Sequence, residues 1–135
     1  MEENHDGTKQ RVRTRPWGLT IAAGLMILFG LAEVGTGFTH NFLGISASSA
    51  ALFTFSAVVL GAFYVVAGML VLTMKRWAAA LAIVLLGADI VGRIALVATG
   101  LYPLSSTENT FGIVAGTVIA ALFAVYIRMR WDLFK

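Results

Sequence analysis

The stretch that decides the fold is residues 46–74, SASSAALFTFSAVVLGAFYVVAGMLVLTM, which contains no charged side chain. A helix of a soluble domain needs a polar face, and this stretch is too apolar to provide one. A hydrocarbon core of about 30 Å is crossed by roughly 20 helical residues, so the stretch is long enough to span a membrane. We therefore take the bilayer, rather than water, as the solvent of this segment.

The composition of the 135-residue chain agrees with a membrane protein. Apolar residues make up 59% of it and charged residues 13%, whereas ordinary soluble proteins have roughly 45–50% and 25%. The absence of cysteine excludes disulfides, thiolate metal sites and iron–sulfur clusters. The two histidines, His5 and His40, form no helical pair, so we expect no metal and no cofactor. Since the sequence has no nucleophile–base pair and no nucleotide loop, we expect no catalytic residues and no enzyme activity.

Four apolar segments have the length of a membrane-spanning helix. They lie near residues 17–39, 50–73, 77–100 and 107–128. They predict an all-α membrane protein, a four-transmembrane-helix bundle. We divide the chain into a polar, basic tail (1–16) and this transmembrane domain (17–135). The first helix is too long and too late for a cleaved signal peptide, so we expect it to remain as an anchor.

Basic residues mark one side of the membrane. Nine of the ten Lys and Arg residues flank the spans on that side: Lys9, Arg11, Arg13, Arg15, Lys75, Arg76, Arg128, Arg130 and Lys135. The positive-inside rule then places both termini in the cytoplasm, in a multi-pass protein of the cell (inner, cytoplasmic) membrane. The net charge of +3 thus reports orientation and not nucleic-acid binding. Trp17, Trp77 and Trp131 stand beside the basic clusters, which is typical of interfacial anchors.

On the opposite side, the loops carry the signals that separate the helices. Pro103 is expected to end the third helix. Ser105 and Glu108 have the spacing of a capping box for the fourth helix, or belong to an ordinary loop.

Three ionisable residues lie within the predicted spans: Glu33, Asp89 and Arg93. Charged groups at this depth are costly and face a bundle interior or a wet cavity, so they are candidates for a functional site. Glu33 follows Trp17 by 16 residues and Arg93 follows Trp77 by 16 residues. The helical rise therefore places both at one level, about 24 Å along their helices. Asp89 precedes Arg93 by one turn, the spacing at which helical side chains meet, so we expect a three-residue charge cluster.

Two interpretations of this cluster stay open. One guanidinium cannot fully compensate two carboxylates in a low dielectric, so one acid is expected to hold a proton at neutral pH and to serve as a proton or substrate site. In the alternative, the cluster is an ion-pair clamp that fixes how the first and third helices pack. His40, at the outer end of the first helix, is a candidate proton relay to Glu33, or a solvated end residue.

Small residues recur at four-residue steps in two of the predicted helices. Helix-packing positions are Gly112, Gly116, Ala120 and Ala124 in the fourth helix and Ala57 and Gly61 in the second. They let a partner backbone approach closely, either within one bundle or between this protein and another membrane protein. The phenylalanines are expected on the lipid surface: Phe29, Phe38, Phe53, Phe55, Phe63 and Phe123.

The two halves of the chain share a weak internal repeat. Residues 28–35 (LFGLAEVG) and 85–92 (LLGADIVG) align with one gap, which pairs Glu33 with Asp89. This suggests two parallel helical-hairpin repeats, an arrangement known in transporters. A chance likeness between apolar helices is the alternative.

In size and helix number the chain is similar to the small multidrug resistance transporters, and Ala32-Glu33-Val34 looks like the setting of their membrane glutamate. The resemblance covers a short stretch of the first helix, and Asp89 and Arg93 have no place in it. It implies that Glu33 binds proton and cation. A likeness to DoxX-type small membrane proteins rests on length alone.

Two functions of different classes follow. The first is a non-enzymatic structural or accessory subunit of a membrane assembly, as a homo-oligomer or in a larger complex, with the lipid bilayer but no nucleic acid as partner. The second is a minimal proton-coupled small-molecule transporter or channel that uses Glu33, Asp89 and Arg93. A dry, fully paired cluster favours the subunit, and a wet cavity at Glu33 favours transport.

Overall fold

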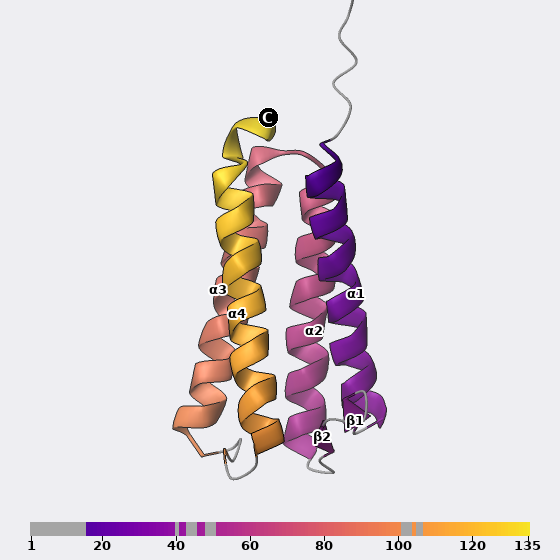
Figure 1. Ribbon diagram of the computed structural model, residues 1–135, viewed down its shortest axis with the longest axis vertical. Helices are drawn as coiled ribbons and strands as arrows, with labels where there is room; N and C mark the ends of the chain where they lie inside the picture. Colours follow the sequence, from indigo (N-terminus) through magenta and orange to yellow (C-terminus); the bar gives the residue numbers. More distant parts are fainter. Residues whose placement is uncertain (1–15, 40, 43–45, 48–50, 101–103, 105–106) are drawn as a thin grey trace, which may run out of the picture.

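A computed structural model of the chain describes residues 16–39, 41–42, 46–47, 51–100, 104 and 107–135. It is a bundle of four long helices (Figure 1). Their bounds are α1 Trp17–Thr39, α2 Ala51–Leu72, α3 Arg76–Ala98 and α4 Thr107–Met129, followed by a short 3-10 helix, η1 Trp131–Leu133. The four-helix bundle predicted from the sequence is confirmed.

All four helices contain a segment that is long and apolar enough to cross a membrane, with 18 to 23 residues in each segment. By length and composition the chain is therefore a small multi-pass membrane protein. Large apolar side chains cover the outer face of α4 at helical spacing, as expected for a surface in contact with lipid: Phe111, Val114, Val118, Leu122 and Val125.

The helix bounds differ from the prediction by at most two residues. The largest difference is in α3, which ends at Ala98 and not at residue 100. Gly100 adopts a left-handed backbone with φ +70°, and its amide donates to the Val97 carbonyl, so this glycine ends the helix ahead of Pro103. Other predictions lie outside the described residues: those on the tail (1–15), on His40, Pro103 and Ser105, and on the side chain of Glu108.

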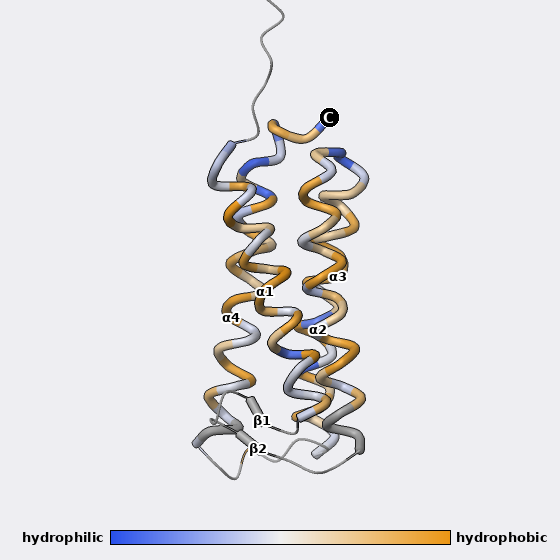
Figure 2. The backbone as a smooth tube through the Cα atoms, turned by 90° about the vertical axis from the view of Figure 1, so that its right-hand side faces the viewer, coloured by the Kyte–Doolittle hydropathy of each residue, from blue (hydrophilic) through white to orange (hydrophobic). Residues whose placement is uncertain are grey.

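The helices form two antiparallel hairpins that stand side by side (Figure 1). We call one end of the bundle the terminal end, because α1 begins there, α2 passes to α3 there, and the described chain finishes there. At the other end, the loop end, β1 (Asn41–Phe42) and β2 (Ser46–Ala47) form a two-stranded antiparallel pair. Figure 2 shows hydrophilic stretches at the terminal end and at one level inside the lower half of the bundle.

In the first hairpin, the backbones of α1 and α2 are in contact. A Cβ atom on Gly30 would lie 2.5 Å from the Gly61 carbonyl oxygen, and a Cβ on Gly61 would lie 2.6 Å from the Gly30 carbonyl oxygen. Two helical turns after Gly61, a Cβ on Gly68 would lie 2.8 Å from the Ala23 carbonyl oxygen. The small residues of α2 therefore serve packing within the bundle. Because they have little or no side chain, they let the two helix backbones approach closely.

The second hairpin does not reproduce this contact. Gly87 of α3 corresponds to Gly30 in the sequence alignment, but nothing lies within 4 Å of where its Cβ would be. The two hairpins thus pack differently, and the proposed duplication stays a prediction from sequence.

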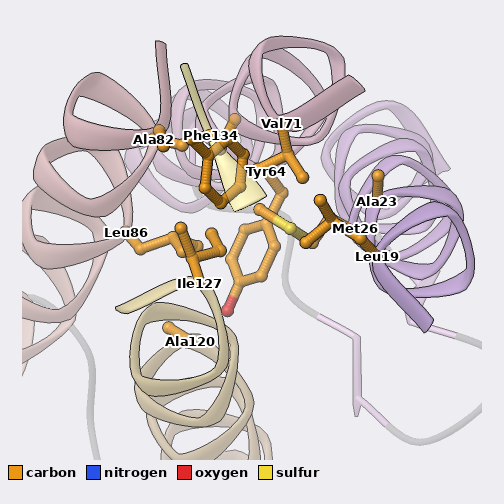
Figure 3. Close-up of a cluster of buried hydrophobic side chains, with 12 residues drawn as sticks. Leu19, Ala23, Met26, Tyr64, Val71, Ala82, Leu86, Ala120, Ile127 and Phe134 are labelled. Atoms are coloured by element: carbon orange, nitrogen blue, oxygen red, sulfur yellow. The ribbon is translucent and has the colours of Figure 1, made fainter. Parts of the chain in front are cut away.

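Between the two hairpins lies the apolar core, to which all four helices and the segment after η1 contribute (Figure 3). Its buried side chains include Leu19, Ala23, Met26, Tyr64, Val71, Ala82, Leu86, Ala120, Ile127 and Phe134. Phe123 packs against this core, with its ring centroid 6.4 Å from those of Phe29 and Tyr64. Phe123, expected on the lipid surface, is therefore half-buried, with its ring packed between the two hairpins.

Candidate functional site

The buried charges lie toward the loop end of the bundle. Glu33 is six residues before the end of α1, and Arg93 is five residues before the end of α3. At the rise of an α-helix these separations are about 9 and 8 Å, so the two side chains stand at the same level. Asp89 is one turn earlier in α3, on the same side of that helix as Arg93.

Arg93 joins the two acids. Its Nη2 donates to Glu33 Oε1 at 2.6 Å and to Asp89 Oδ1 at 3.2 Å, and its Nε donates to Asp89 Oδ2 at 3.0 Å. The bond to Asp89 is bidentate, the strongest arrangement for a guanidinium and a carboxylate. The Asp89 side chain is fully buried, that of Arg93 is 8% exposed and that of Glu33 is 18% exposed. The structure therefore brings together the three residues that the sequence singled out.

Gly116 of α4 makes room for the guanidinium. A Cβ at this position would lie 2.5 Å from one terminal nitrogen of Arg93 and 2.7 Å from its Cζ. In the same helix Ala120 is fully buried and Gly112 is half-buried. The small-residue stripe of α4 thus faces the bundle interior, and at Gly116 it accommodates a charged side chain.

Tyr64 of α2 is the fourth polar side chain of the site, and sequence reasoning missed it. Its hydroxyl donates to the Gly116 carbonyl oxygen at 3.0 Å, beside the position that makes room for Arg93. The signal was present: tyrosines of membrane proteins concentrate at the interfaces, whereas Tyr64 is eight residues inside the end of α2. With it, every one of the four helices contributes to the cluster.

The buried polar groups of the cluster have hydrogen-bond partners within the protein. Among the described residues, no buried side-chain nitrogen or oxygen lacks a hydrogen-bond partner. A paired charge in a low-dielectric interior is far less costly than an unpaired one. The cluster nevertheless contains two carboxylates for one guanidinium, and Glu33 is its most exposed member. Chemically, the arrangement can hold helices in register, and Glu33 is the member of the cluster that is most accessible from outside.

The predicted interfacial tryptophans lie at the terminal end. Trp17 is 83% exposed, Trp77 is 59% exposed, and Trp131 of η1 is half-buried.

The described residues contain no group of three or more His, Cys, Asp or Glu side chains that could hold a metal ion. Comparison of the chain with protein-family models, with curated proteins and with solved structures finds no match. Its function is therefore inferred from its own residues.

Proposed function

We propose that this protein is a non-enzymatic structural or accessory subunit of a membrane assembly, in which the buried cluster acts as a clamp. The observation that supports this role is the set of bonds between helices in the cluster: Arg93 bonds Glu33 and Asp89, and Tyr64 links α2 to α4 beside them. Apolar contact alone does little to hold helices together in lipid, so such polar links fix their arrangement. The bundle then presents a rigid surface to a partner.

The outer surface of the bundle is suited to a lateral partner. Gly24 on α1 and Gly87 on α3 both have open space where a Cβ would project, so another helix can approach closely there. The inward-facing Gly61 and Gly116 are already engaged within the bundle. We therefore assign docking to the outer faces of α1 and α3, toward a second copy or another membrane protein.

Purification in mild detergent tests the subunit role. The full chain is isolated under conditions that keep membrane complexes intact, and the mass and composition of the particle are measured. A stable particle that contains other membrane proteins, or a defined homo-oligomer without transport activity, supports the proposal. Gly87→Leu, which puts bulk on an open outer face, is expected to dissociate the particle, whereas Val118→Leu on α4 is the matched control. A monomer under all conditions contradicts the proposal.

We also propose that both termini lie in the cytoplasm. The described basic residues outside the cluster are all at the terminal end, and none of the described residues at the loop end is basic. Because the chain has no cysteine, a single introduced one is a unique label. Asp132→Cys is expected to react with a membrane-impermeant maleimide only after permeabilisation, and Leu104→Cys in intact cells. The reverse pattern would contradict the orientation.

Proton-coupled transport is the second candidate, and one observation favours it. Glu33 is 18% exposed, and the cluster has one carboxylate more than it has guanidinium groups. Such a carboxylate can exchange a proton with a substrate during a transport cycle. In proteoliposomes containing a pH-sensitive dye, transport predicts a cation-driven pH change that Glu33→Gln abolishes while the protein stays folded. The clamp alone predicts no pH change with either chain.

A further inference from the structure

A second group of charged residues lies at the terminal end, outside the buried cluster. Five basic residues of the described chain are exposed there: Lys75, Arg76, Arg128, Arg130 and Lys135. None of them forms an ion pair with a described acidic residue, since the described ion pairs are those of Arg93. Asp132, the one described acid at this end, is itself exposed. Among the described residues, the positive charge of this surface is therefore paired with no acid.

Aromatic rings hold two of these arginines in place. The Cζ atom of Arg128 lies 5.7 Å from the ring centroid of Trp131, and that of Arg130 lies 5.8 Å from the ring centroid of Tyr126. Both distances are within the range of a cation–π interaction. Stacking restrains a long side chain without using its N–H groups as an ion pair would. The edges of both guanidinium groups therefore stay available to an oxygen ligand.

The segment after α4 brings Arg76 to the same surface. The Lys135 amide donates to the Met74 carbonyl at 3.0 Å, and the Arg76 amide donates to the Lys135 carbonyl at 2.8 Å. The Arg76 Nε donates to the Phe134 carbonyl at 3.0 Å, while the Phe134 ring is fully buried in the core. This docking fixes the start of α3 beside the end of α4. Arg76, Arg128 and Arg130 therefore all lie where the start of α3 meets the end of α4, and we call these three residues the arginine face.

Two exposed tryptophans indicate where the arginine face lies relative to the membrane. Trp17 and Trp77 are at the terminal end and are 83% and 59% exposed. Exposed tryptophans of membrane proteins lie at the level of the lipid headgroups. The arginine face begins at the same level, because Arg76 immediately precedes Trp77 in α3. Its guanidinium groups therefore stand where lipid phosphates lie.

We propose that the arginine face binds the phosphate groups of anionic phospholipids in the leaflet at the terminal end. A planar guanidinium can bind two phosphate oxygens at once, and an anionic headgroup supplies negative charge to basic residues that pair with no described acid. Two chemical features thus select the lipid: a phosphate for the guanidinium fork and a net negative charge for the uncompensated surface. This site is separate from the clamp and does not depend on the accessory role.

A lipid titration tests the assignment. The full chain in a neutral maltoside detergent is titrated with phosphatidylglycerol, and the thermal unfolding midpoint and the lipids retained in native mass spectrometry are followed. Phosphatidylglycerol is expected to raise the midpoint and to remain bound, and phosphatidylcholine with the same acyl chains is not. Arg128→Gln/Arg130→Gln is expected to need about 30-fold more phosphatidylglycerol for the same effect.

Two control variants make the test specific. Lys9→Gln/Arg11→Gln removes the same charge from the segment before α1 and is expected to leave the phosphatidylglycerol requirement close to that of the original chain. Arg128→Lys/Arg130→Lys keeps the charge and loses the planar fork, so the phosphatidylglycerol it requires is expected to lie between that of the original chain and that of Arg128→Gln/Arg130→Gln. It also provides the test if Arg128→Gln/Arg130→Gln does not fold. The proposal is overturned if the lysine variant matches the original chain, if the two glutamine variants lose affinity equally, or if phosphatidylcholine or inorganic phosphate gives the same shift.

Discussion

The two groups of charged residues in this protein differ in how they are compensated. In the buried cluster, the single guanidinium of Arg93 bonds two carboxylates from two helices. On the arginine face, Arg128 and Arg130 stack on aromatic rings and pair with no described acid. The hydrocarbon core supplies no hydrogen-bond partner, so a charge there must be paired inside the protein, whereas water and headgroups supply partners at the interface. In the roles we propose, the buried group fixes how the bundle packs, and the exposed group binds the surrounding lipid.

Removing the shared guanidinium is expected to have the largest effect. Arg93→Met leaves Glu33 and Asp89 side by side without a cation, and breaking a buried pair in this way costs about 3–5 kcal/mol. We expect a large fall in the thermal unfolding midpoint of the chain in neutral detergent. Arg128→Gln, which removes an equal charge from the exposed group, should lower the midpoint little, since surface charges contribute about 0–1 kcal/mol. Equal losses in the two variants would remove the contrast between the groups.

A smaller loss is expected when the space around the guanidinium is filled. Gly116→Ala puts a Cβ 2.5 Å from an Arg93 nitrogen, and overpacking of this kind costs about 1–3 kcal/mol. The matched control is Gly87→Ala, which meets nothing within 4 Å and should be neutral or slightly stabilising, because alanine is the better helix former. Denaturation of both variants in the same detergent gives the comparison. A Gly87→Ala chain destabilised as much as Gly116→Ala would show that the loss does not come from contact with Arg93.

Removing a single hydroxyl should have the smallest effect of the three. Tyr64→Phe deletes the bond to the Gly116 carbonyl, and a hydrogen bond contributes about 1 kcal/mol. Tyr126→Phe keeps the ring under Arg130 and serves as the control at the terminal end. We expect a modest fall in the midpoint for Tyr64→Phe and a smaller change for Tyr126→Phe. If the two variants change the midpoint equally, the hydroxyl of Tyr64 does not help to stabilise the cluster.

Much of the buried cluster could be predicted from the sequence because its position follows from helical geometry. The equal spacing from Trp17 to Glu33 and from Trp77 to Arg93 places the two side chains at one level, and four-residue spacing brings Asp89 to Arg93. Both arguments use distances along single helices. The number of helices could also be predicted, because the length of each apolar stretch is likewise a property of a single helix.

The contacts that sequence reasoning missed depend on how the helices are rotated against one another. Nothing local to Tyr64 indicates that its hydroxyl reaches Gly116, 52 residues away. The small-residue stripe of α4 predicted a neighbouring backbone, but the neighbour at Gly116 is the Arg93 side chain. The docking of Phe134 likewise depends on the turn between α2 and α3, far from it in the sequence.

Neutralising the whole cluster tests the central claim that Arg93, by bonding both carboxylates, holds the bundle together. The measurement is the free energy of unfolding in neutral detergent for Arg93→Met and for the triple variant Glu33→Gln/Asp89→Asn/Arg93→Met. Replacing a complete buried ion-pair set is often close to neutral, whereas removing one partner costs about 3–5 kcal/mol. We therefore predict that the triple variant recovers most of the stability that Arg93→Met loses. A triple variant no more stable than Arg93→Met would contradict the clamp.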